Sequence, residues 1–170
     1  MKTIIAIFFA LGLLLASLVT DAQSKSDKMY NVFANKDGVT NFSFSRNMID
    51  AVDVNLNNDD EDESNVTGDL YQVRFMSYNP KKGAISGSEF TKRAISYLPK
   101  SSYKKYESEK DDNSEIWLLG GKKKFKECHI FTKSDNNDQL RFVVSFYGDF
   151  KVNDLDKLKN TGKSISANEE

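Results

Sequence analysis

Cysteine and histidine each occur once in this 170-residue chain, as the neighbours Cys128 and His129. A single cysteine excludes an intramolecular disulfide, so stability has to come from core packing. Zinc sites use three or four nitrogen and sulfur ligands, which these two residues cannot supply unless carboxylates complete the set. The sequence also lacks a G-x-S-x-G nucleophile motif. We therefore predict no bound cofactor, no metal and no catalytic residue.

An excess of charge of either sign is missing as well. The chain has 24 Lys and Arg against 25 Asp and Glu, which gives a net charge of −1. Proteins that bind nucleic acid usually present a basic surface that displaces counterions from the phosphates. Nucleic acid is therefore not an expected partner.

Long apolar runs are absent except at the N-terminus, where Lys2 precedes the uncharged residues 4–19. The small residues Thr20 and Ala22 then occupy the positions that a signal peptidase inspects, so residues 1–22 are predicted to be a signal peptide cleaved before Gln23. Roughly 16 apolar residues fall short of the ~20 of a membrane-spanning helix, which disfavours the alternative of a retained anchor. We expect an exported protein, soluble in the periplasm or outside the cell, with no transmembrane anchor after cleavage.

About 150 residues remain after cleavage, enough for one domain that buries about two-thirds of its unfolded surface. Residues 23–160 are predicted to form this domain, and residues 161–170 a flexible tail. Apolar spacing predicts helices over 26–38 and 45–56, and strands over 39–44 and 70–78. Ser86 and Glu89 form a capping box for a further helix, which Pro99 stops.

The C-terminal half alternates with a period of two. It predicts strands over 103–109, 115–120, 125–133 and 139–149, joined by short polar turns, and a final helix over 152–158. Short turns between successive strands favour an antiparallel arrangement. The predicted fold class is α+β: a two-layer sandwich whose antiparallel-rich sheet, with a C-terminal four-strand meander, has helices packed on one face.

Three stretches carry a resemblance to a known family. They are residues 36–45 (KDGVTNFSFS) with Met48, residues 97–99 (YLP), and residues 146–150 (FYGDF) followed by Asp154, Leu155 and Leu158. The chain resembles, over nearly all of 24–160, an uncharacterised family of exported proteins of Gram-negative bacteria, the domain-of-unknown-function family 4252. The resemblance implies a signal peptide and one α+β domain, with no activity or ligand to carry over.

A Cys–His catalytic pair is the first hypothesis that Cys128 and His129 suggest. Adjacent strand residues point to opposite faces of a sheet, so the thiol and the imidazole are predicted to be separated by the backbone. Cys128 is therefore expected to be a small core residue beside Ile130.

Acidic residues offer two other hypotheses. Calcium favours clustered oxygen ligands, but the acidic run lacks the glycine and the bidentate glutamate of an EF-hand loop, so a solvated loop is the preferred interpretation of Asp59, Asp60, Glu61, Asp62 and Glu63. Paired carboxylates of a cofactor-free hydrolase acting on an envelope polymer stay open as the alternative function, because their separation is a structural quantity.

Two surfaces are candidates for binding. A turn rich in lysine could contact an anionic head group or glycan through Lys122, Lys123, Lys124 and Lys126, although solvated lysines are the preferred interpretation. Alternation also places apolar residues on both faces of the C-terminal strands, so an exposed patch is expected at Trp117, Val143 and Tyr147. This patch would bind an envelope protein or ligand, or mediate a homodimer. The leading hypothesis is a non-enzymatic binding or protein-interaction module of the bacterial envelope.

The predicted cleavage site gives a direct test. Intact-mass measurement on secreted protein should show a chain that begins at Gln23. A mass that retains residues 1–22 would contradict both the predicted export and the loss of the anchor.

Overall fold

The structure is a computed structural model that describes residues 24–48, 70–106, 114–121, 123–133 and 140–151, with Leu155 and Leu158. The predicted signal peptide, the acidic run from Asp59 to Glu63, Lys122 and the tail lie outside the described residues. No helix in the described part of the chain is long and apolar enough to cross a membrane.

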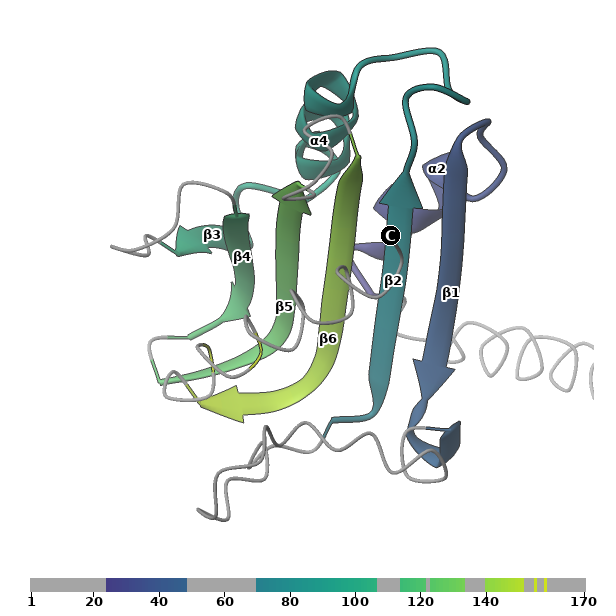
Figure 1. Cartoon of the computed structure of the whole chain (residues 1–170). Helices are drawn as coiled ribbons and strands as arrows, with labels where there is room; N and C mark the ends of the chain where they lie inside the picture. Colours follow the sequence, from purple (N-terminus) through teal and green to yellow (C-terminus); the bar gives the residue numbers. More distant parts are fainter. Residues whose placement is uncertain are drawn as a thin grey trace, which may run out of the picture.

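One six-stranded sheet forms the centre of the protein, and its strand order is β1-β2-β6-β5-β4-β3 (Figure 1). Every neighbouring pair is antiparallel. The sequence prediction of an antiparallel-rich α+β fold is thus confirmed. The strands are β1 (Val39–Ser45), β2 (Gln72–Tyr78), β3 (Tyr103–Tyr106), β4 (Ser114–Gly120), β5 (Lys124–Lys133) and β6 (Arg141–Lys151).

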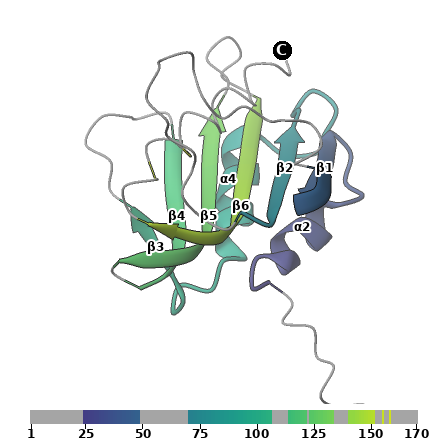
Figure 2. The ribbon, with the colours of Figure 1, turned by 90° about the horizontal axis from the view of Figure 1, so that it is seen from below.

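Two helices lie on one face of this sheet, α2 (Asp27–Phe33) and α4 (Gly87–Ser96) (Figures 1 and 2). The capping box begins α4 as predicted, because the Ser86 hydroxyl accepts a hydrogen bond of 3.1 Å from the Glu89 N–H. Phe90 of α4 stacks on Tyr78 of β2 at 4.6 Å and meets Phe33 of α2 edge-on at 4.9 Å. These aromatic contacts join both helices to the sheet.

The side chains of the sheet form two hydrophobic clusters. One includes Met76 and Val143 and packs under α2 and α4. The other lies on the opposite face, where Phe75 and Val144 pack with Leu155 and Leu158. Because both leucines are helical, the prediction that helices cover only one face is not confirmed. The sheet is covered on both faces, which lets its strands be apolar on both sides.

The exposure expected for Val143 and Tyr147 is wrong. Their relative exposures are 0% and 1%, because Val143 packs in the cluster under α2 and α4 and Tyr147 is hydrogen-bonded to Ser26, just before α2. Trp117 is half-buried and packs against the same cluster. The three residues therefore form no exposed apolar patch, and the binding surface has to be sought elsewhere.

The turn between α2 and β1 depends on a glycine. Gly38 has φ +80°, and a Cβ atom added there would lie 2.5 Å from the backbone oxygen of Asn79. Gly38 and Asn79 are also joined by a hydrogen bond, since the Asn79 N–H donates to the Gly38 oxygen at 2.8 Å. No side chain fits without moving this junction.

We expect Gly38→Ala to lower the free energy of unfolding by at least about 2 kcal/mol, since the left-handed conformation alone costs roughly 1–2 kcal/mol and the clash adds to it. Urea titration measures this loss. Gly121→Ala is the matched control, because the nearest atom to its Cβ would lie 3.8 Å away. Equal effects of the two substitutions would contradict the prediction.

Candidate functional site

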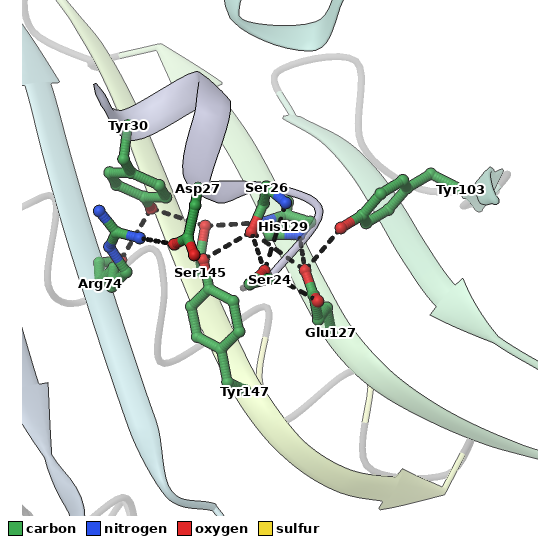
Figure 3. Close-up of polar contacts among 10 residues, drawn as sticks. All are labelled: Ser24, Ser26, Asp27, Tyr30, Arg74, Tyr103, Glu127, His129, Ser145 and Tyr147. Atoms are coloured by element: carbon green, nitrogen blue, oxygen red, sulfur yellow. Dashed lines mark hydrogen bonds and ion pairs between the residues drawn. The ribbon is translucent and has the colours of Figure 1, made fainter. Parts of the chain in front are cut away.

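A cluster of polar side chains lies between α2 and the sheet (Figure 3). Glu127 and His129 are two residues apart on β5 and so point to the same face. On β6, Tyr147 and Ser145 lie directly opposite them in the antiparallel register. We call this group the buried polar cluster; it comprises Ser24, Ser26, Tyr30, Tyr103, Glu127, His129, Ser145 and Tyr147.

Glu127 is the acidic centre of the buried polar cluster and is only 5% exposed. Ser24 donates to its Oε1 at 2.9 Å, whereas Ser26 and Tyr103 donate to its Oε2 at 3.0 and 2.6 Å. His129 Nε2 lies 3.1 Å from the same Oε2. A buried carboxylate is expensive unless several donors replace its water, and here the donors come from three separate segments.

A continuous hydrogen-bonded chain runs from α2 to Glu127. The Tyr30 hydroxyl donates to Ser145 Oγ at 2.6 Å, which leaves the Ser145 proton for His129 Nδ1, also at 2.6 Å. His129 then carries its proton on Nε2 and donates it to Glu127. In this assignment Ser145 and His129 each accept one hydrogen bond and donate one.

An ion pair closes the side of the cluster that faces β2. Arg74 Nη1 lies 2.5 Å from Asp27 Oδ1 on α2, and its guanidinium stands 3.7 Å from the centre of the Tyr30 ring. Both charged side chains are mostly buried, at 17% and 24% exposure. Arginine thus fixes the position of α2 through an ion pair and a cation–π contact.

The protonation states follow from burial and from these bonds. Burial acts to raise the pKa of Glu127, but the hydrogen bonds from His129, Tyr103 and Ser24 outweigh it and hold that pKa below its usual value. Complete burial lowers the pKa of His129, and the opposing influence of Glu127 does not restore it. At neutral pH the carboxylate is therefore ionised and the imidazole is neutral.

The tyrosines act as donors throughout the physiological range. Burial is the main reason why the pKa of Tyr147 is raised to about 12, and it also raises the pKa values of Tyr30 and Tyr103. Tyr147 makes a 2.8 Å hydrogen bond with Ser26, whose own proton goes to Glu127. Each phenol remains protonated and so keeps its bond in the network.

The order Ser145–His129–Glu127 has the connectivity of a Ser–His–acid relay, but its surroundings are those of a structural network. Ser145 and His129 are 0% exposed, and Tyr30 occupies the hydroxyl that a substrate would have to approach. Cys128, as predicted, points to the other face, where it lies in the opposite hydrophobic cluster. Burial raises the pKa of this thiol well above its usual value, which keeps it unreactive.

The sequence reasoning missed this cluster, although one signal was present. Period-two alternation puts Glu127 beside His129 on one face, and puts Ser145 between the apolar Val143 and Tyr147. Polar residues in the middle of two otherwise apolar strands indicate a buried network. The participation of Ser24, Ser26 and Tyr103 depends on tertiary contacts between residues up to 103 positions apart.

The predicted lysine surface is described in part. Lys123, Lys124 and Lys126 are exposed, and the turn that carries them closes through a 2.8 Å hydrogen bond from the Gly121 N–H to the Lys124 oxygen. Solvated lysines remain the preferred interpretation of this turn, and contact with an anionic head group or glycan remains the alternative.

The outer edge of β1 is the second candidate site. The Asn79 N–H donates to the Gly38 oxygen, so this pair extends the β1–β2 ladder as a hydrogen-bonded pair. Because such pairs alternate in an antiparallel ladder, Asn41, Ser43 and Ser45 direct their backbone N–H and C=O groups away from β2. Val39 agrees with this parity, since its N–H donates to Lys36 rather than to β2.

The two edges of the sheet differ in protection. Natural sheets protect an edge by placing lysines on it, and the described residues of β3, Tyr103–Tyr106, carry the exposed Lys104 and Lys105. In contrast, β1 has 7 residues, VTNFSFS, without charge, proline or glycine. Among the described residues, β1 is thus the sheet edge that is open to another strand.

Comparison with known proteins gives one match. The model of a family described as Domain of unknown function (DUF4252) matches residues 30–158. No curated protein and no solved structure matches the chain.

The buried polar cluster predicts how stability depends on pH. His129 is the only histidine, and its folded pKa lies below its ordinary value. Between about pH 7.5 and about pH 5.5 the unfolded chain therefore binds more protons than the folded chain, and the free energy of unfolding should fall, by at most roughly 1.4 kcal/mol. Glu127, whose pKa is lowered, loses its own contribution only at still lower pH.

Urea titrations at both pH values measure this difference. His129→Gln is the control, since the chain then has no imidazole and the part of the slope that belongs to His129 should vanish. A slope that is the same in both proteins would show that His129 is not responsible.

Proposed function

The chain belongs to the family of domains of unknown function DUF4252, and we propose that it is an exported, non-enzymatic interaction module that binds an extended strand of a partner along the outer edge of β1. Strand addition of this kind gains affinity from main-chain hydrogen bonds and specificity from alternate side chains. The observation that carries the proposal is the uncharged seven-residue edge of β1, in contrast to the opposite edge, β3, which bears lysines.

Exposed side chains around β1 support this surface. Phe42 and Phe44 are only half-buried, although they pack against each other at 5.2 Å. Met48, 47% exposed, follows the end of β1, and Tyr71, 52% exposed, precedes the residue that pairs with Ser45. Exposed apolar groups therefore gather at the Ser45 end of β1.

The buried polar cluster supports a non-enzymatic role. Glu127 has all its donors within the protein, and Ser145 and His129 are out of contact with solvent. A surface hollow of about 470 Å³ lies on α2, but its lining includes Ser24 and Asp27 and none of Glu127, His129 and Ser145. The carboxylate-based hydrolase gains no supporting observation from this geometry.

Export of the protein rests on the N-terminal pattern, namely Lys2, the apolar residues 4–19 and the small residues before Gln23. The domain begins soon afterwards, because Ser24 and Ser26 already bind Glu127. A cut before Gln23 would leave both serines in the mature chain. The expected cleavage and the observed network are therefore compatible.

Photo-crosslinking in cells that secrete the protein tests the proposed edge. A benzophenone side chain at Thr40 should give a discrete adduct, whereas the same group at Lys104 on β3 should not. Ser43→Pro removes an N–H that points away from β2 and should reduce the Thr40 adduct at least about tenfold, while the β1–β2 ladder stays intact.

Ser43→Thr is the matched control, because threonine keeps the N–H and favours strands, so the adduct should persist. Thermal melts should show that both variants are folded. An adduct that is equally strong with Ser43→Pro, or that also forms at Lys104, would disprove binding along β1.

A further inference from the structure

We infer that the partner strand is β1 of a second copy of this chain, so that two six-stranded sheets join into one continuous sheet across a two-fold axis at Phe42. This inference rests on the proposed function of the β1 edge. A two-fold dimer brings the same surface of both copies together, so that surface has to complement itself. The sequence and register of β1 meet this condition in three respects.

The backbone register is the first. Outward-directed backbone hydrogen-bonding groups belong to Asn41, Ser43 and Ser45, and to Val39 through its C=O. In a new ladder, these residues must lie opposite one another in hydrogen-bonded pairs. An antiparallel pairing centred on Phe42 does so, because Asn41 then lies opposite Ser43 of the second copy and Val39 opposite Ser45. Of the centred registers, this one pairs all 7 residues of β1.

Side-chain chemistry is the second. Phe42 stacks on Phe75 at 4.7 Å and is the outermost member of an apolar row that crosses the sheet through Val144, Ile130 and Ile116. In a single copy of the chain, this row ends at Phe42, whose ring is only half-buried. In the proposed register Phe42 meets Phe42 of the second copy in a non-hydrogen-bonded pair, where side chains approach most closely. The row then continues into the second sheet.

Charge is the third. No charged residue lies within β1, so no like charges oppose each other across the axis.

Light scattering on the secreted protein between about 5 and about 500 μM tests the association. A pair of seven-residue strands is a small interface, so a dimer that depends on concentration is expected rather than a permanent one. The mass should rise toward twice that of one chain for the wild type and for Ser43→Thr. Ser43→Pro should stay monomeric over the whole range.

Disulfide trapping tests the register independently of affinity. Phe42→Cys should crosslink to itself, because the Cα atoms of such a pair lie about 4.5 Å apart, within the range of a disulfide. Thr40→Cys is the control, since its two copies would lie roughly 13 Å apart along the strands. Cys128 is buried and does not compete.

The outcomes separate the two proposals. A wild-type protein that stays monomeric at about 500 μM, or a Ser43→Pro variant that dimerises like Ser43→Thr, overturns the dimer. A crosslink at Thr40 without one at Phe42 overturns the register. If the protein is monomeric but the Thr40 photo-adduct has a mass other than twice that of the chain, β1 binds a different partner and only the second-copy inference fails.

Discussion

Glu127 places a negative charge in the interior of the protein, and the arrangement of the surrounding segments follows from the need to replace its lost water. Donors reach it from β3 through Tyr103, from β5 through His129, and from the residues before α2 through Ser24 and Ser26. Removal of one partner from such a network leaves a buried polar group unsatisfied, which typically costs about 1–3 kcal/mol. The N-terminal segment is therefore held in one position by directional bonds as well as by apolar packing.

This constraint explains why the helix-side face of the sheet is divided. At one end, Met76 and Val143 pack with α4 as an ordinary apolar layer. Under the start of α2, the same face carries Ser145, His129 and Glu127 instead. Apolar packing gives most of the stability, because it scales with buried area, whereas the polar part fixes which segment covers the sheet and in what register. The opposite face is apolar throughout its centre and needs no such specification.

Stability and association are separated in space. The titratable groups that could perform chemistry are sealed beneath α2, while the backbone groups that could bind another strand lie at β1, which β2 separates from β6. The lysines on β3 make the uncharged edge of β1 informative, because the same sheet shows how an edge is protected. A buried network and an open edge are the two features from which the proposed role is built.

Local patterns in the sequence determined the elements. The capping box at Ser86 predicted the start of α4. Period-two alternation predicted the bounds of β4, β5 and β6 to within about two residues. The opposite orientation of Cys128 and His129 followed from their adjacency in a strand. These features depend on neighbours along the chain, so a single sequence contains them.

Tertiary structure alone decided which faces are covered and which polar groups meet. Val143 and Tyr147 were expected at the surface because the count of helices left one face bare, whereas α2 and α4 cover one face and Leu155 and Leu158 pack on the other. The bond from Ser24 to Glu127 joins residues 103 positions apart, and its partners are selected by the burial of a charge. Periodicity reports the direction of a side chain relative to its own strand; what lies on that side depends on segments brought there by the fold.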